Sequence, residues 1–281
     1  MMSFSLQFVL VLIGTFMIAL VLTPLVRLFS FKIDAVDYPN ARRINTKPMP
    51  SAGGLSIVIA FSIATLVLIP MLTSTTAPIK SYLSYTLPVV GAGWIIALTG
   101  LIDDVKELSA KKKMIGILLA ASLVWFLTDF RLNDFKIPFG GPLLHFEPWL
   151  SYLLTVIWIV AITNAVNLID GLDGLVSGVS IISLVTMGIV SYFFLPVPNL
   201  FLTMTIFVLV ASIAGFFPFN YHPAILYLGD TGALFIGFMI SVLSLQGLKN
   251  ATAVAVVTPM IILGVPITDT FLAIIRRTLS G

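Results

Sequence analysis

Residues 150–195 read LSYLLTVIWIVAITNAVNLIDGLDGLVSGVSIISLVTMGIVSYFFL, and this stretch decides the fold class. It holds two apolar runs, and its only charged residues, Asp170 and Asp173, lie between them. Each run is long enough to cross a hydrocarbon core of about 30 Å as a helix. The pattern predicts two transmembrane helices, over 150–168 and 174–195, joined by a short acidic turn.

The composition extends this pattern to the whole chain. Of its 281 residues, 59% are hydrophobic and 10% are charged, whereas soluble domains carry about 25% charged residues. We therefore predict an all-α, polytopic membrane bundle of about nine helices, which forms a single transmembrane domain over 1–281. The other predicted spans are 4–28, 53–72, 85–102, 114–128, 199–218, 231–248 and 252–275. The loop 129–149 is rich in turn-forming residues and is predicted to hold a short hairpin.

Several kinds of protein are excluded by residue usage. The chain has no cysteine, so disulfides and cysteine-ligated metals are excluded. Its two histidines argue against a multi-histidine zinc site. The formal charge of +3 is explained by basic cytoplasmic loops, so no nucleic-acid partner is expected.

Charged residues gather on one face of the predicted bundle. The loops of that face and the adjoining helix ends hold 11 of the 15 Lys and Arg residues, which makes the face cytoplasmic and places the N-terminus outside. The same face holds nine of the 12 acidic residues, although the rule for basic residues does not require this. We therefore predict a multi-pass protein of the plasma membrane with a reaction site at its cytoplasmic face.

Two adjacent aspartates, Asp103 and Asp104, end the third predicted span. Neighbouring carboxylates repel each other and are best tolerated beside a divalent cation or basic groups. Four lysines follow within ten residues: Lys106, Lys111, Lys112 and Lys113. Such alternation suits a site that holds Mg²⁺ together with phosphate, and an ordinary solvated loop is the alternative.

A regular polar stripe ends the fifth predicted span. Its members recur at every third position and are Asn164, Asn167, Asp170 and Asp173. Residues three apart are neighbours on a helix, so the stripe is expected to face a shared cavity, since lipid would disfavour it. A polar packing seam with its carboxylates among the head groups is the alternative.

Two further segments carry candidate site residues. Asp230, in Leu228-Gly229-Asp230-Thr231-Gly232, starts the eighth predicted span at a helix N-terminus that favours anions, and simple capping is its alternative. The first cytoplasmic loop offers basic groups that suit phosphate, or that only follow the positive-inside rule. These basic residues are Arg42, Arg43 and Lys47.

Together these residues resemble the polyprenyl-phosphate N-acetylhexosamine-1-phosphate transferases, of the glycosyltransferase 4 type, from about Asp37 to the last residue. The resemblance is carried by the following segments: Arg42-Arg43 with Pro48-Met-Pro-Ser-Ala-Gly53-Gly54, Gly100-Leu-Ile-Asp103-Asp104, Asn164-Ala-Val-Asn167-Leu-Ile-Asp170-Gly-Leu-Asp173-Gly174, and Leu228-Gly229-Asp230-Thr231-Gly232. Members of this family move a sugar 1-phosphate from a UDP-sugar to a lipid phosphate, release UMP and need Mg²⁺ or Mn²⁺.

The resemblance implies roles for these positions. Asp103 and Asp104 match the family's catalytic aspartates, one of which is proposed to deprotonate the lipid phosphate. Asp230 matches the magnesium-binding aspartate, and Lys113 matches a lysine that meets phosphate. The polar stripe matches the nucleotide-sugar contacts, with Asp173 against uracil. Further nucleoside-pocket positions are Asn220, Tyr227 and Gly229.

The resemblance also suggests a particular branch. The run Lys47-Pro-Met-Pro-Ser-Ala-Gly-Gly54 is closer to the undecaprenyl-phosphate GlcNAc-1-phosphate transferases, which initiate teichoic acid and O-antigen in cell wall biogenesis, than to the MurNAc-pentapeptide branch. The expected partners are UDP-GlcNAc, undecaprenyl phosphate and membrane lipid, and a homodimer is expected from the family alone. Because the family continues into a histidine-rich loop and a tenth helix, the chain is expected to be C-terminally truncated. A transporter or channel with a charged vestibule, and a truncated inactive member of the family, remain as alternatives.

Overall fold

A computed structural model describes residues 4–39, 47–73, 79–136, 141–193 and 200–248. Its helices are α1 Phe4–Lys32, α2 Gly54–Ile63, the π-helical segment η1 Ala64–Leu68, α3 Ile69–Thr73, α4 Ile79–Lys106, α5 Ala110–Leu127, α6 Pro148–Leu168, α7 Leu175–Phe193, α8 Leu200–Asn220 and α9 Gly229–Leu248. Two antiparallel hairpins complete it, β1 Val36–Asp37 with β2 Met49–Pro50, and β3 Asp134–Lys136 with β4 Leu143–His145.

The predicted all-α, polytopic membrane fold is confirmed. Six helical segments of the described chain are long and apolar enough to cross a membrane, and α9 supplies a shorter apolar segment over Gly229–Leu245. Eight predicted spans correspond to helices, with α2, η1 and α3 forming one of them. The ninth predicted span, 252–275, lies outside the described residues. The hairpin predicted within 129–149 is also present as β3 and β4.

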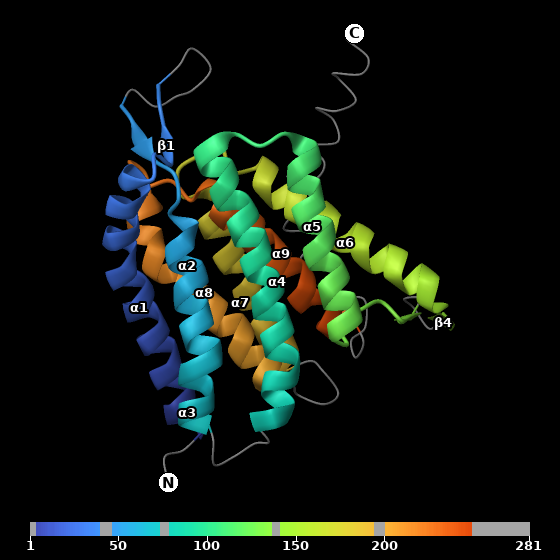
Figure 1. The fold of residues 1–281 in the computed structure, drawn as a ribbon. Coiled ribbons are helices and arrows are strands. Elements are labelled where there is room, and N and C mark those ends of the chain that lie inside the picture. The colour runs from blue at the N-terminus through green and yellow to red at the C-terminus, as the bar shows by residue number, and fades with distance from the viewer. Residues whose placement is uncertain (1–3, 40–46, 74–78, 137–140, 194–199, 249–281) are drawn as a thin grey trace.

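Helix α9 forms the centre of the bundle. Every residue from Thr231 to Leu245 is buried, and the helix packs mainly against α4 and α6, with α2 beside it (Figure 1). Two of its glycines permit this close packing. A Cβ on Gly232 would lie 2.8 Å from the Cα of Gly54, and a Cβ on Gly237 would lie 2.9 Å from the Cα of Thr163. Gly229 and Asp230, at the start of α9, are partly exposed, so the helix enters the buried interior at Thr231.

The connections that carry the predicted site lie together at one end of the bundle, which is the upper end in Figure 1. The β1–β2 hairpin, the α4–α5 connection and the segment before α9 all lie there. Backbone hydrogen bonds tie the segment before α9 to the start of α2. Gly53 donates to the Tyr227 carbonyl at 3.0 Å, and Gly54 donates to the Leu228 carbonyl at 2.8 Å. The fold therefore brings loops from distant parts of the sequence to one end.

Candidate active site

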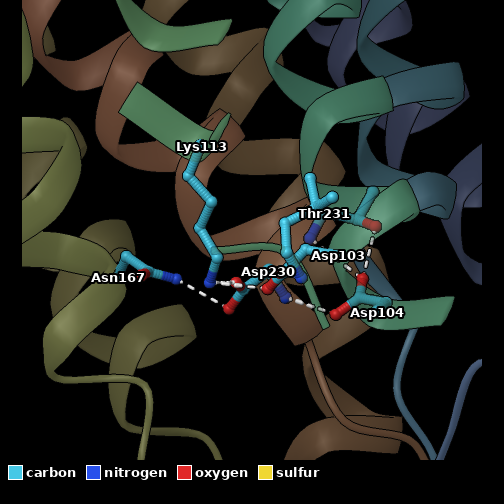
Figure 2. Close-up of polar contacts among 7 residues, drawn as sticks. Asp103, Asp104, Lys113, Asn167, Asp230 and Thr231 are labelled. Carbon is cyan, nitrogen blue, oxygen red and sulfur yellow. Dashed lines mark hydrogen bonds and ion pairs between the residues drawn. The ribbon is translucent and has the colours of Figure 1, made fainter. Parts of the chain in front are cut away.

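Three charged side chains from three helices meet at this end of the bundle (Figure 2). The Lys113 ammonium, on α5, lies 2.5 Å from Oδ2 of Asp103, on α4. It also forms an ion pair with Oδ2 of Asp230, in the first turn of α9. The three side chains are 26%, 11% and 23% exposed, so they are neither sealed in the core nor fully in water. A single cation thus bridges two carboxylates at the edge of the bundle.

The short α4–α5 connection explains how Lys113 reaches this place. Glu107 has a φ of 47°, which turns the chain sharply at the end of α4. The backbone N–H of Leu108 then donates to Oδ1 of Asp103. Helix α5 begins at Ala110, earlier than the predicted span at 114, so Lys113 lies within its first turn. Asp103 therefore holds the turn with one oxygen and Lys113 with the other.

Asp104 points to a different partner, the start of α9. Its Oδ1 accepts a hydrogen bond from the backbone N–H of Asp230 at 2.8 Å. Its Oδ2 accepts from the backbone N–H of Thr231 at 3.0 Å and from the Thr231 hydroxyl at 2.5 Å. The first N–H groups of a helix have no partner within the helix, and here Asp104 supplies one from another helix. Sequence reasoning assigned no role to Thr231, although a Thr after an Asp at a predicted helix start is a capping signal.

The predicted polar stripe divides among several partners. Asn167, on α6, donates from Nδ2 to Oδ1 of Asp230 at 2.8 Å and joins the charged group. Asn164 instead donates to the Val160 carbonyl of its own helix at 2.8 Å. Asp170 lies beyond the end of α6. Burial, followed by the negative charges of Asp230 and Asp104, raises the pKa of Asp170 to about 8. Asp170 is therefore close enough to Asp230 and Asp104 for their charges to affect its pKa.

Asp173 belongs to a second polar cluster, between the α6–α7 turn and the segment after α8. Its Oδ2 lies 2.9 Å from Nδ1 of His222 and accepts from the Ala224 N–H at 3.0 Å. Nearby, the Ser177 hydroxyl donates to Oδ1 of Asn220 at 2.8 Å, and Nδ2 of Asn220 donates to the Leu226 carbonyl at 3.3 Å. The sequence predicted one pocket for all these carboxylates. In the described residues, Asp103, Asp104 and Asp230 share contacts, whereas Asp173 pairs with His222.

The other predicted site residues have backbone roles or lie elsewhere. Tyr227 donates its backbone N–H to the Pro50 carbonyl at 2.9 Å. Gly229 has a φ of +70°, and a Cβ there would lie 1.6 Å from the Ser51 carbonyl oxygen, so this position requires glycine. Lys47 is exposed beside the β1–β2 hairpin. Arg42 and Arg43 lie outside the described residues.

The charged group has the composition that a magnesium ion prefers. Within the described chain, no group of three or more His, Cys, Asp or Glu side chains is arranged as a complete metal site. Mg²⁺, however, keeps several waters and usually takes only one or two carboxylates together with substrate phosphates. Asp103 and Asp230 already direct two carboxylate oxygens at one cation, the Lys113 ammonium. The acidic excess of Asp103, Asp104 and Asp230 over one lysine also favours a further cation, so these residues fit the metal.

Fold and site together define a polytopic membrane protein with an acidic centre, bridged by lysine, at one end of its bundle. Residues 86–248 match the family described as glycosyl transferase family 4. The chain belongs to this family and is a transferase, as the sequence motifs predicted.

Three relatives from different bacteria illustrate the family. A Bacillus subtilis protein named probable undecaprenyl-phosphate N-acetylglucosaminyl 1-phosphate transferase is 42% identical over 98% of this chain and 73% of its own length. The decaprenyl-phosphate N-acetylglucosaminephosphotransferase of Mycolicibacterium smegmatis is 32% identical over 91% of this chain and 67% of its own length. A phospho-N-acetylmuramoyl-pentapeptide-transferase of Staphylococcus saprophyticus is 33% identical over 85% of this chain and 74% of its own length. The higher identity to the Bacillus protein agrees with the predicted branch.

Proposed function

We propose that this protein transfers GlcNAc-1-phosphate from UDP-GlcNAc to undecaprenyl phosphate and releases UMP. The observation that carries the proposal is the meeting of Asp103, Lys113 and Asp230 at the N-terminal end of α9, with Asn167 beside them. Phosphoryl transfer needs fixed positive charge and positioning more than covalent chemistry from the protein. The names of the Bacillus and mycobacterial relatives support the choice of donor and lipid acceptor.

In the proposed reaction, an oxygen of the lipid phosphate attacks the phosphorus that carries the sugar. A new P–O bond forms there, the bond to the bridging oxygen of the donor breaks, and UMP leaves with that electron pair. The second pKa of a phosphate monoester is about 6, so the lipid phosphate is largely ionised at neutral pH and gains little from a base. Charge neutralisation and alignment are therefore the larger contributions.

The described residues divide these tasks. The Lys113 ammonium lies between Asp103 and Asp230, where it would attract the anionic phosphate oxygens of either substrate. Asn167 holds the Asp230 carboxylate in one orientation through Oδ1. A Mg²⁺ or Mn²⁺ ion held by Asp230 and Asp103 would offset charge on the donor diphosphate and on the departing UMP. Asp173, Asn220, Tyr227 and Gly229 remain the proposed nucleoside side of the site.

The membrane orientation is part of the proposal. The basic residues at this end of the bundle favour the cytoplasmic face of the plasma membrane, where UDP-sugars are available. The lipid phosphate then reaches the site by moving laterally in the inner leaflet. A transporter, the alternative from sequence, is disfavoured because the acidic groups lie at one end of the helices and because the chain belongs to a transferase family.

The test is UMP release from UDP-GlcNAc by the purified chain in lipid, with undecaprenyl phosphate, with and without Mg²⁺. We expect release that needs both the lipid phosphate and the metal. Asp230→Asn should lower the rate by on the order of 10²–10³-fold, because the proposed metal ion loses a carboxylate ligand and no longer offsets the charge of the diphosphate. Asp129→Asn is the matched control, since Asp129 follows the C-terminal end of α5, opposite to the end that holds Lys113, and pairs with Arg131. A folded wild-type chain that releases no UMP would refute the proposal. The alternative, an inactive member of the family, would then hold.

A further inference from the structure

We propose that Asp104 is a positioning residue that acts through the first turn of α9, and that it does not deprotonate the lipid phosphate. The inference rests on the function proposed above and separates the two adjacent aspartates that the sequence treats as a catalytic pair. Asp103 faces the Lys113 ammonium, whereas Asp104 faces the α9 backbone. One aspartate is thus directed at the charged centre and the other at the helix that carries Asp230.

The hydrogen bonds of Asp104 engage both of its oxygens. Oδ1 accepts from the N–H of Asp230, and Oδ2 accepts from the N–H and the hydroxyl of Thr231. These three bonds direct both oxygens at the α9 backbone and the Thr231 hydroxyl, and not at the Lys113 ammonium. Its negative charge also lies at a helix N-terminus, where the helix dipole favours an anion. The geometry therefore gives Asp104 the task of a cap supplied by a neighbouring helix.

Asp104 is connected to the charged centre directly, through the backbone of Asp230. The capped N–H belongs to Asp230 itself, so the same residue receives the cap through its backbone and presents its carboxylate to Lys113 and Asn167. Gly100 lets α4 touch this turn, since a Cβ there would lie 2.5 Å from the Asp230 carbonyl carbon. Loss of the cap would let the first turn of α9 fray, and the Asp230 carboxylate would no longer be oriented toward Lys113 and Asn167.

A kinetic double-mutant cycle tests this role. Thr231→Val removes one of the three bonds to Asp104 and should lower the rate of UMP release about tenfold. Asp104→Asn should lower it about 100-fold, because a misplaced Asp230 costs alignment. The double variant should be no slower than Asp104→Asn alone, since both changes act on the same cap. Thr186→Val, whose hydroxyl donates to Ile182 of its own helix, is the matched control.

The metal requirement separates positioning from proton transfer. If Asp104 positions Asp230, both Asp104→Asn and Thr231→Val should need more Mg²⁺ for half-maximal rate, because the metal-binding carboxylate is misplaced. A general base would behave differently. Asp104→Asn would then lower the rate without changing the Mg²⁺ requirement, and the two rate losses would multiply. That result would overturn the inference.

Hydrogen exchange tests the cap without reference to activity. In lipid nanodiscs, the amides of Asp230 and Thr231 should exchange faster in Asp104→Asn than in Thr186→Val. Unchanged exchange would overturn the inference even if the wild-type chain transfers sugar phosphate. Faster exchange in a wild-type chain that shows no UMP release would uphold the cap while refuting the proposed function. The two failures are therefore distinguishable.

Discussion

Two glycines on α4 allow a matched test of how closely α9 must approach this helix. A Cβ on Gly100 would lie 2.5 Å from the carbonyl carbon and oxygen of Asp230 and from the nitrogen of Thr231. These are backbone atoms, so no side chain can rotate away. A Cβ on Gly91, nine residues earlier on the same helix, would meet nothing within 4 Å. The substitutions Gly100→Ala and Gly91→Ala therefore make the same chemical change in opposite packing environments.

The expected magnitudes follow from these distances. Gly91→Ala should stabilise the chain by up to about 1 kcal/mol, because alanine favours a helix over glycine. Gly100→Ala receives the same benefit but forces the start of α9 to retreat by about 1 Å, and overpacking of this kind costs about 1–3 kcal/mol. The net change in the free energy of unfolding should lie between about zero and 2 kcal/mol of destabilisation. A shift of about 1 Å in Asp230 should slow UMP release by on the order of 100-fold.

Thermal unfolding in detergent and the rate of UMP release, measured side by side on the two variants, test this reasoning. We expect Gly91→Ala to match the wild-type rate and to unfold at the same or a higher temperature. Gly100→Ala should lose most of its rate while losing little stability. If Gly100→Ala stays as active as Gly91→Ala, the backbone contact between α4 and α9 does not position Asp230, and the argument from close packing is refuted.

Three further substitutions address individual charges. Lys113→Met should bind Mn²⁺ roughly fivefold more tightly without substrate, because the ammonium that competes for the two carboxylates is gone. The same variant should release UMP more slowly. Weaker Mn²⁺ binding, measured by electron paramagnetic resonance, would contradict this. The pKa of Asp170 is raised to about 8, so its ionisation opposes the fold, and stability is lost as pH rises from the unfolded value of 3.8 through about 8. Asp170→Asn should therefore raise the unfolding temperature more at about pH 9 than at about pH 5, and equal gains would argue against the shift. Asp173→Asn should raise the KM for UDP-GlcNAc with little change in kcat, and a loss confined to kcat would exclude a donor-binding role.

The helices were predicted well from the sequence because the length of each apolar run was the deciding signal. An apolar run that can cross the membrane has few alternatives to a helix, since every backbone polar group must be satisfied within it. The motifs also predicted that Asp103, Lys113 and Asp230 belong to one site. The partners of each carboxylate could not be predicted, because they depend on how each helix is rotated against its neighbours. Asp103 and Asp104 are adjacent in sequence, yet they bond different helices.

The polar stripe shows where a periodic argument stops. Spacing by three predicts a common face only while the chain stays helical, and α6 ends at Leu168. Asn167 lies inside the helix and reaches Asp230, whereas Asp173 lies in the turn before α7 and pairs with His222. Asn164 is helical as well, but its amide bonds the carbonyl four residues earlier. An amide within an apolar helix can satisfy itself in this way, so helical position alone does not direct it to a site.

The segment between α8 and α9 connects the two polar clusters. At one end, Asn220 accepts a hydrogen bond from Ser177 of α7 and His222 contacts Asp173 of the α6–α7 turn. At the other end, Asp230 meets Lys113. Between them, backbone bonds to Gly53 and Gly54 fix its path. A donor with its nucleoside against the first cluster and its diphosphate near the second would lie along this segment. Because each cluster is held by packing and hydrogen bonds from several helices, the fold would fix the spacing between the base and the diphosphate of such a donor, as alignment for phosphoryl transfer requires.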